Sequence, residues 1–157
     1  MQNPWRSTIV GAGALVMGVL LVAPLSSPAE AAKKPKSCTI LKAAEIEKVV
    51  GAAVSGPGKG GTLGIGCDFD VGLGIGDPGG GLVVIQVYSG TTAKSVWSAA
   101  KAGEKVGKVY WDPTSKIASG YKKPNMVAAS ISYTGGPPES EVKAASIALV
   151  DLTLKKL

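Results

Sequence analysis

The chain has 157 residues and carries 17 Lys plus Arg against 11 Asp plus Glu, a formal net charge of +6. It contains no histidine, and Arg6 is its only arginine. It therefore lacks the side chain that exchanges protons near neutral pH and, beyond Arg6, the guanidinium that clamps anionic substrates. These absences argue against an enzyme, and no cofactor is indicated. Scattered lysines and an aromatic content of only 5% argue against a nucleic-acid partner.

Residues 1–31 have the pattern of a secretory signal peptide. Arg6 gives the start its positive charge, residues 9–25 contain no charged side chain, and prolines follow. Small residues at the −3 and −1 positions predict cleavage between Ala31 and Ala32. The alternative is an uncleaved anchor, because about 17 apolar residues are at the lower limit for spanning a bilayer.

The segment after the predicted cleavage site is basic and contains no lipid-attachment signal. Its first cysteine, Cys38, comes too late for a lipoprotein, so we expect a secreted or cell-wall-associated protein that meets the membrane only through an uncleaved signal. Residues 32–37 have no large apolar side chain and should form a mobile arm. Lys33, Lys34 and Lys36 are candidate contacts to anionic cell-envelope polymers, although lysines also simply keep an exported domain soluble.

The first part of the mature chain predicts a helix, a glycine-rich region and a strand. Apolar residues fall three or four apart between residues 40 and 50, and Gly51 stands where a helix C-cap glycine belongs. Residues 51–81 hold more than half of the 22 glycines, so we expect loops there around one short strand at 65–71. The β-branched run at 82–88 predicts a central strand buried on both faces.

The second part predicts a helix, a meander and a final helix. Apolar residues at helical spacing begin at Ala93, and Gly103 ends them. Turn residues separate three short strand-like runs at 106–111, 116–119 and 126–133. A last helix begins near Pro137, and its two apolar stripes predict packing on both sides.

These elements predict one α+β domain at 38–157, with a mainly antiparallel sheet of about five strands, two to three helices and one disulfide. Cys38 and Cys67 are the only cysteines, and in an exported chain they favour a disulfide over a metal or catalytic site. A bridge that closes a loop of about 30 residues should stabilise the fold by about 3 to 4 kcal/mol. It would tie the first helix to the first strand.

Two other patterns were weighed as sites. Residues 56–61 match G-x-G-x-x-G, but a helix precedes them and a strand follows, the reverse of a dinucleotide site, so we interpret them as a flexible loop. Four carboxylates could meet around a cation such as calcium: Asp68, Asp70, Asp77 and Asp112. Their spacing is not that of an EF-hand loop, so we interpret them as solvated acids and predict no metal site.

Several short motifs resemble one known family. Residues 38–41 (CTIL), 44–46 (AEI) and 49–51 (VVG) resemble the opening of the DUF3558 family of actinobacterial exported proteins, and 66–69 (GCDF) resembles its later cysteine followed by an aromatic. The Tyr-Trp pair at 110–111 is also similar. The resemblance implies an envelope location in a high-GC Gram-positive organism, a disulfide between the two cysteines and no activity. Many members are lipoproteins whose signal ends in a cysteine that carries the lipid, and this chain has no cysteine at that position. Glu45, in the 44–46 motif, is interpreted as an exposed helix acid.

Three functions follow from these observations. The leading hypothesis is a non-catalytic binding or accessory protein of the cell envelope, whose partner is an anionic polymer or another envelope protein. The alternative is a carrier of a small, lipid-like ligand, with a cavity between the sheet and the C-terminal helix. The third is an enzyme that works without histidine, through Lys, Tyr or carboxylates.

Overall fold

The computed structural model describes residues 37–61, 66–74, 76 and 78–157. Several predicted features lie outside these residues: the signal peptide, Ala31, Ala32, Lys33, Lys34, Lys36 and Asp77. Ser37, which was assigned to the mobile arm, is instead buried at the start of a helix.

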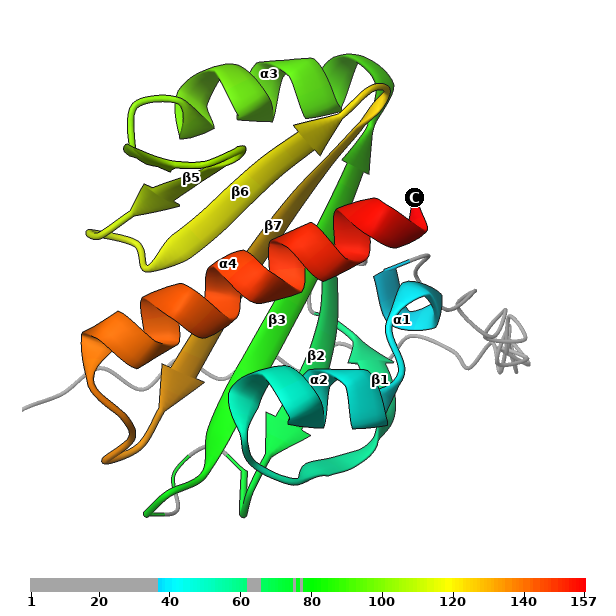
Figure 1. Ribbon diagram of the computed structural model, residues 1–157. Coiled ribbons are helices and arrows are strands. Elements are labelled where there is room, and N and C mark those ends of the chain that lie inside the picture. The colour runs from blue at the N-terminus through cyan, green and yellow to red at the C-terminus, as the bar shows by residue number, and fades with distance from the viewer. Residues whose placement is uncertain (1–36, 62–65, 75, 77) are drawn as a thin grey trace, which may run out of the picture. The chain divides into compact units, whose positions relative to one another are not determined.

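Seven strands form one antiparallel sheet in the order β1-β2-β3-β7-β6-β5-β4 (Figure 1). Their bounds are β1 Val54–Gly60, β2 Gly66–Val71, β3 Gly81–Ser89, β4 Glu104–Val106, β5 Val109–Asp112, β6 Ile117–Lys122 and β7 Asn125–Tyr133. Strands β1 to β3 form one meander and β4 to β7 form another. The two meanders join where β3 pairs with β7.

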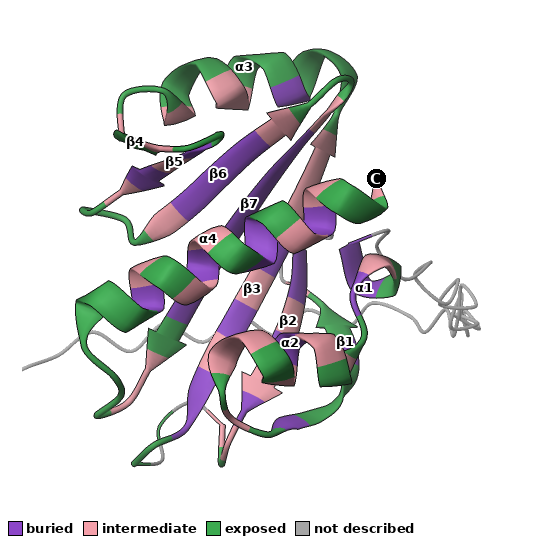
Figure 2. Cartoon of the chain, in the orientation of Figure 1, coloured by how far each residue is buried: buried purple, intermediate pink, exposed green. Residues whose placement is uncertain are grey.

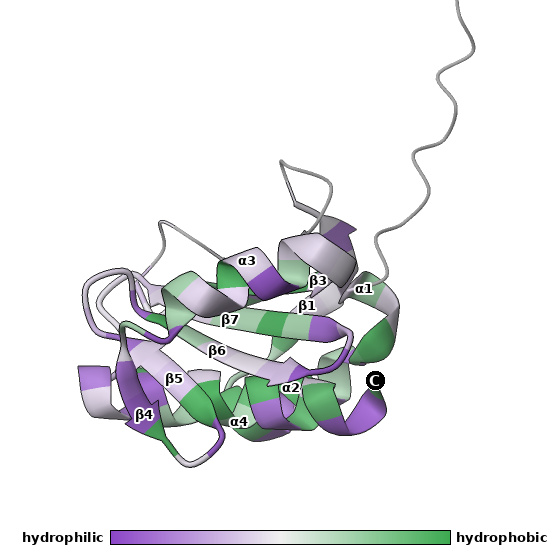
Figure 3. Ribbon diagram, turned by 90° about the horizontal axis from the view of Figure 1, so that it is seen from above, coloured by the Kyte–Doolittle hydropathy of each residue, from purple (hydrophilic) through white to green (hydrophobic). Residues whose placement is uncertain are grey.

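Four helices cover this sheet unequally. Their bounds are α1 Ser37–Ile40, α2 Ala43–Val50, α3 Gly90–Ala100 and α4 Glu139–Lys156. Helices α1, α2 and α4 lie on one face, whereas α3 lies on the other (Figures 1 and 3). None of the helices within the described residues is both long and apolar enough to span a bilayer.

The predicted α+β class and antiparallel sheet are confirmed, but the predicted numbers of strands and helices are wrong. The structure has seven strands and four helices. Strand β1 was missed because it lies in the glycine-rich region, where we expected loops. Gly58 is buried there against the Cys67 sulfur and the Phe69 ring, so this glycine leaves room for neighbouring side chains. Residues 56–61 are therefore mostly an edge strand, not the expected flexible loop.

The strand predicted at 82–88 is confirmed, but it is not equally buried on both faces. In β3, Val83 and Ile85 are fully buried under the helices of one face, whereas Leu82 and Val84 on the other face are half-buried. The open face lacks a continuous helical cover because α3 lies over only one end of it. Figure 2 shows the fully buried residues concentrated on the central strands and on one side of α4.

Helix α4 packs across β5, β6 and β7. Gly120 on β6 permits this close approach, because a Cβ atom there would lie 2.6 Å from Val150 and 2.7 Å from Leu154. One apolar stripe of α4, which contains Val150 and Leu154, therefore meets the sheet. The other stripe contains the buried Leu149 and the half-buried Ala145, and α4 also contacts α2. The prediction of packing on two sides is consistent with these contacts.

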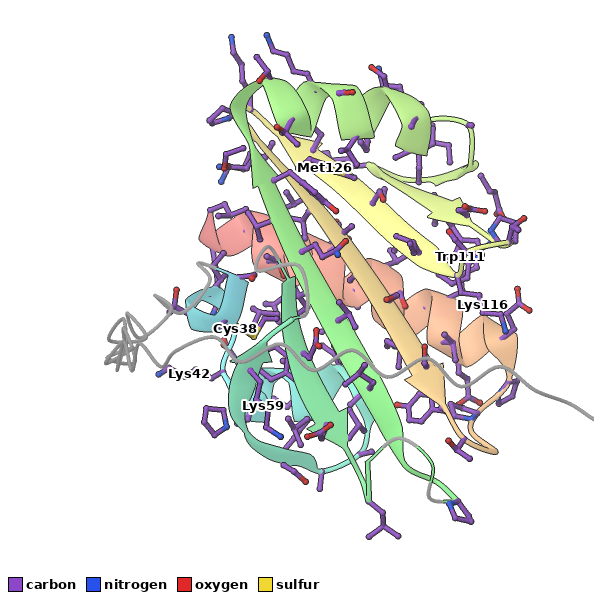
Figure 4. All side chains as sticks on the ribbon, turned by 180° about the vertical axis from the view of Figure 1, so that it is seen from behind. Cys38, Lys42, Lys59, Trp111, Lys116 and Met126 are labelled. Atoms are coloured by element: carbon purple, nitrogen blue, oxygen red, sulfur yellow. A yellow bond between two sulfur atoms is a disulfide. The ribbon has the colours of Figure 1, made fainter. Side chains whose placement is uncertain are left out.

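The predicted disulfide is confirmed. Cys38 in α1 and Cys67 in β2 are bridged, with a Cα–Cα distance of 5.0 Å (Figure 4). Helix α1 has only four residues, too few to be stable by itself. The bridge therefore holds the start of the folded unit against the sheet.

Removing the bridge should destabilise the protein. It closes a loop with a sequence separation of 29. We expect the Cys38→Ala/Cys67→Ala double variant to lose about 3 to 4 kcal/mol of unfolding free energy, because its unfolded chain regains loop entropy. Urea denaturation measures the change, and reduced wild-type protein is the control. An unchanged midpoint would show that the bridge is dispensable.

Ser146 allows a test in which a core substitution should stabilise the protein. Its hydroxyl is buried on α4 without a hydrogen-bond partner among the described residues. Ser146→Ala should therefore raise the unfolding free energy by about 1 kcal/mol, since a desolvated, unpaired hydroxyl is removed. Thr153→Val is the control, because the Thr153 hydroxyl donates to the Leu149 carbonyl at 2.7 Å, and this change should destabilise. A loss of stability in Ser146→Ala would contradict the assignment.

Candidate functional site

Three segments that are distant in sequence meet at one end of the sheet: the start of α3, the β6–β7 turn and the end of α4. The Gly90 N–H donates to the Pro124 carbonyl at 3.1 Å. The Lys122 ammonium donates to the Leu154 carbonyl at 3.2 Å. These two contacts place the three segments at the same end of the sheet, with α3 and α4 on opposite faces.

Five exposed lysines lie on these segments, and we call their surface the lysine-rich end. They are Lys94 on α3, Lys122 and Lys123 at the β6–β7 turn, and Lys155 and Lys156 on α4. Asp151 lies one turn before Lys155 on α4, and the Glu45 carboxylate pairs with Lys156 at 2.6 Å. Among the described residues, the other four lysines form no ion pair with an acid.

The end of α4 favours positive charge for a local reason. The last carbonyls of a helix have no partner within the helix and carry a partial negative charge. Lys155 and Lys156 occupy the last turn, and Lys122 donates to one of its carbonyls. Part of the role of these lysines is therefore structural, whereas Lys94 and Lys123 have no ion pair or hydrogen bond from their ammonium groups among the described residues.

Glu45 connects this end to α1 and α2. Its carboxylate accepts hydrogen bonds from the Lys42 N–H at 2.9 Å and from the Lys156 ammonium at 2.6 Å. The same ammonium donates to the Ile40 carbonyl at 3.3 Å. The prediction that Glu45 is simply an exposed acid is therefore wrong, because the residue is partly buried and caps α2. The Lys156 hydrogen bond, followed by that of Lys42, lowers the pKa of Glu45 below its usual value.

The predicted arm is attached at this same end. Ser37 begins α1, and α1 contacts the end of α4 through Ile40 and Lys156. The chain therefore enters the described folded unit beside the end of α4.

The opposite end of α4 has a different charge balance. Its first turn contains Glu139 and Glu141, which suits the positive end of the helix dipole. Lys116 and Glu139 line one hollow there, and Lys48 and Glu141 line a neighbouring groove. Positive and negative side chains are matched in number at this end, so the excess positive charge of the α4 axis lies at its C-terminus.

Of the four aspartates considered as cation ligands, Asp77 lies outside the described residues, and Asp112 lies apart from Asp68 and Asp70. The Asp70 carboxylate pairs with Lys59 at 3.1 Å. Sheet register places Asp68 and Asp112 four strands apart, which corresponds to about 19 Å. No group of three potential metal ligands occurs within the described residues. Burial, and secondarily the charge of Asp70, raises the pKa of Asp68.

A groove of about 520 Å³ lies between α2 and α4. Val49 and Val50 line one side, Ala144 and Ala148 line the other, and Tyr133 of the sheet also contributes. This groove is the hollow that comes nearest to the lipid-carrier hypothesis. Ala144 and Ala148 are exposed, so it is open to solvent beside the C-terminal helix.

Comparison with known protein families, curated proteins and solved structures finds no match to this chain. The resemblance to the DUF3558 family therefore stays a hypothesis. Sequence reasoning singled out the arm lysines but not the five of the lysine-rich end. The pairs at 122–123 and 155–156 were visible as sequence, but their convergence depends on the pairing of distant segments.

The Glu45 contacts predict a stability change in acid. A carboxyl group whose pKa is lower in the folded state stabilises above its unfolded pKa, and this stability is lost as pH falls through its folded pKa. Glu45→Gln should therefore be less stable than wild-type protein at neutral pH. This difference in unfolding free energy should shrink below about pH 5, as the wild-type carboxylate becomes protonated. The difference should be below about 1 kcal/mol, because the ion pair is partly exposed. Urea denaturation between pH 3 and 7 measures it, with exposed Glu139→Gln as the control. Parallel pH profiles for wild type and Glu45→Gln would contradict the assignment.

Proposed function

We propose that this protein is an exported, non-catalytic binding protein of the cell envelope that attaches to polyanionic surfaces through its lysine-rich end. The observation that supports the proposal is the convergence of exposed lysines on the end where residues 1–36 join the folded unit. The absence of histidine from the whole chain supports a non-catalytic role.

The chemistry of lysine indicates the class of partner. Its ammonium is strongly hydrated and suits diffuse attraction better than a fitted ion pair. A lysine near an anionic membrane surface contributes about 1 kcal/mol, and the attraction decays over about 8 Å at physiological salt. The matching partner is a dense array of phosphates or carboxylates, as in acidic lipid headgroups or anionic envelope polymers.

The position of the N-terminal attachment gives this binding an orientation. The lysine-rich end would face the anionic surface, because Ser37, the first described residue, belongs to the helix that contacts the end of α4. Lys33, Lys34 and Lys36 precede Ser37 by only one to four residues and remain candidate contacts to the same anionic partner.

A charge-matched pair of variants tests the proposal on the chain that begins at Ala32. Lys94, Lys123 and Lys155 are changed to Gln in one variant, and Lys48, Lys108 and Lys116 in the control. Both variants lose three positive charges, but only the first loses them at the lysine-rich end. Cosedimentation with phosphatidylglycerol vesicles at low salt should weaken about tenfold or more in the first variant and much less in the control.

Further binding measurements separate the possible results. Phosphatidylcholine vesicles should not bind, and binding to acidic vesicles should fade as salt is raised. Anionic cell-wall polymer in place of vesicles shows which source of negative charge is preferred. Equal losses in the two variants would show that net charge alone governs binding and would overturn the proposed surface. Binding that persists in high salt would exclude the electrostatic mechanism.

A further inference from the structure

The open face of the sheet contains a second candidate site, unrelated to the lysine-rich end. A cavity of about 230 Å³ lies between α3 and the strands below it. In Figure 4, which views this face, Met126 marks the floor beneath α3. We call this cavity the α3 pocket.

The floor of the α3 pocket is hollowed in the middle and has polar side chains on both sides. Sheet register places Gln86, Ala128 and Ser119 in one row across β3, β7 and β6. The small Ala128 side chain leaves space between the two polar ones. Two strand spacings separate Gln86 from Ser119, which corresponds to about 10 Å.

Ser119 is the first sign that the pocket is built for a ligand. Its side chain lines the cavity and is only 4% exposed. Its hydroxyl makes no hydrogen bond to another described residue and, unlike the Ser146 hydroxyl, it is not sealed from solvent. It can therefore bond to water in the free protein and to a ligand hydroxyl in the complex.

Gln86 and Asp112 supply two of the remaining polar groups, and Tyr88, Tyr110 and Ser115 also line the pocket. The Tyr88 hydroxyl donates to the Gln86 Oε1 atom at 2.9 Å, which leaves the amide NH₂ group to donate. The Asp112 carboxylate accepts from the Ser115 hydroxyl at 2.6 Å and from the Thr114 N–H at 2.9 Å. These contacts, that of Ser115 first, lower the pKa of Asp112. The carboxylate therefore remains ionised and has lone pairs left to accept further hydrogen bonds.

The rest of the lining is apolar. Val96 and Ala100 of α3 form the roof, and Ile117 and Met126 contribute to the floor. Among the described residues, no lysine lines the pocket, although the chain is rich in lysine. An anionic ligand would therefore meet Asp112 without a compensating positive charge from the lining.

We propose that the α3 pocket binds one neutral, polyhydroxylated ring of monosaccharide size. Each sugar hydroxyl both donates and accepts, which matches a lining with a donor amide, an acceptor carboxylate and an unpaired serine hydroxyl. The C–H face of the ring matches Ile117, Met126 and the roof of α3. The volume equals about eight water molecules, which suits a single sugar ring and is too small for a lipid chain.

Ligand-observed saturation-transfer NMR on the chain that begins at Ala32 tests the proposal. The probes are D-glucose, D-galactose, D-mannose and D-arabinose, each with its methyl glycoside, and choline, acetate and decanoate for comparison. At least one sugar should receive saturation from the protein. Binding of the free sugar alone indicates a soluble ligand, whereas equal binding of the methyl glycoside indicates the end of a glycan.

Two variants, each with a control, locate the site. Ala99→Phe adds a ring at the mouth of the pocket and should abolish transfer, whereas Ala144→Phe, at an equally exposed alanine of α4, should not. Ser119→Ala should weaken the sugar about three- to tenfold, because one hydrogen bond is lost, and Ser130→Ala on the same sheet face should not.

The outcomes are independent of the lysine-rich end, which these variants leave intact. Transfer to choline, acetate or decanoate alone would overturn the proposed ligand class. Transfer to no probe, or unchanged transfer to sugars in Ala99→Phe, would overturn the site. Ser119→Ala removes an unpaired hydroxyl, so its folding can be verified by urea denaturation before binding is compared.

Discussion

The pairing of β3 with β7 is the constraint on which the rest of the structure depends. Nine residues of β3 pair with nine of β7, from Gly81 opposite Tyr133 to Ser89 opposite Asn125. Each meander consists of hairpins between neighbours in sequence, but two short meanders expose an edge each and bury little. Their union creates one wide sheet, and only that sheet offers α4 a surface long enough to pack on.

The union also makes the two faces of the sheet unequal. The connection from β3 to the second meander runs through α3, which lies on one face, whereas α1, α2 and α4 occupy the other. Three helices and the disulfide bury one face thoroughly. A single helix leaves space at its margin on the other, and the α3 pocket occupies that space. The pocket is thus a consequence of sparse cover, lined by polar groups that a closed core would exclude.

The lysine-rich end arises at the same end of the β3–β7 pair. Since β3 ends where β7 begins, the start of α3 and the β6–β7 turn are neighbours. The end of α4 joins them because α4 crosses the sheet toward this end, where Lys122 meets its last carbonyls. Folding brings the two lysine pairs at 122–123 and 155–156 to the same end of the sheet, which adds repulsion between the pairs to the repulsion within each pair. An anionic surface would relieve that repulsion.

The sequence by itself determined what depends on neighbours along the chain. Helical spacing at 40–50, from Ala93 to Gly103 and from Pro137 onward, the strand at 82–88 and the single pair of cysteines were all sufficient, because periodicity and composition are local. Only the tertiary structure decided that the glycine-rich residues 56–60 belong to an edge strand, since pairing with β2 overrides their weak strand preference. It also decided that Glu45 meets Lys156, that five lysines lie at one end of the sheet, and that Ser119 lines a pocket. Those outcomes depend on which distant strands pair and which face each helix covers, and no single stretch of sequence encodes either.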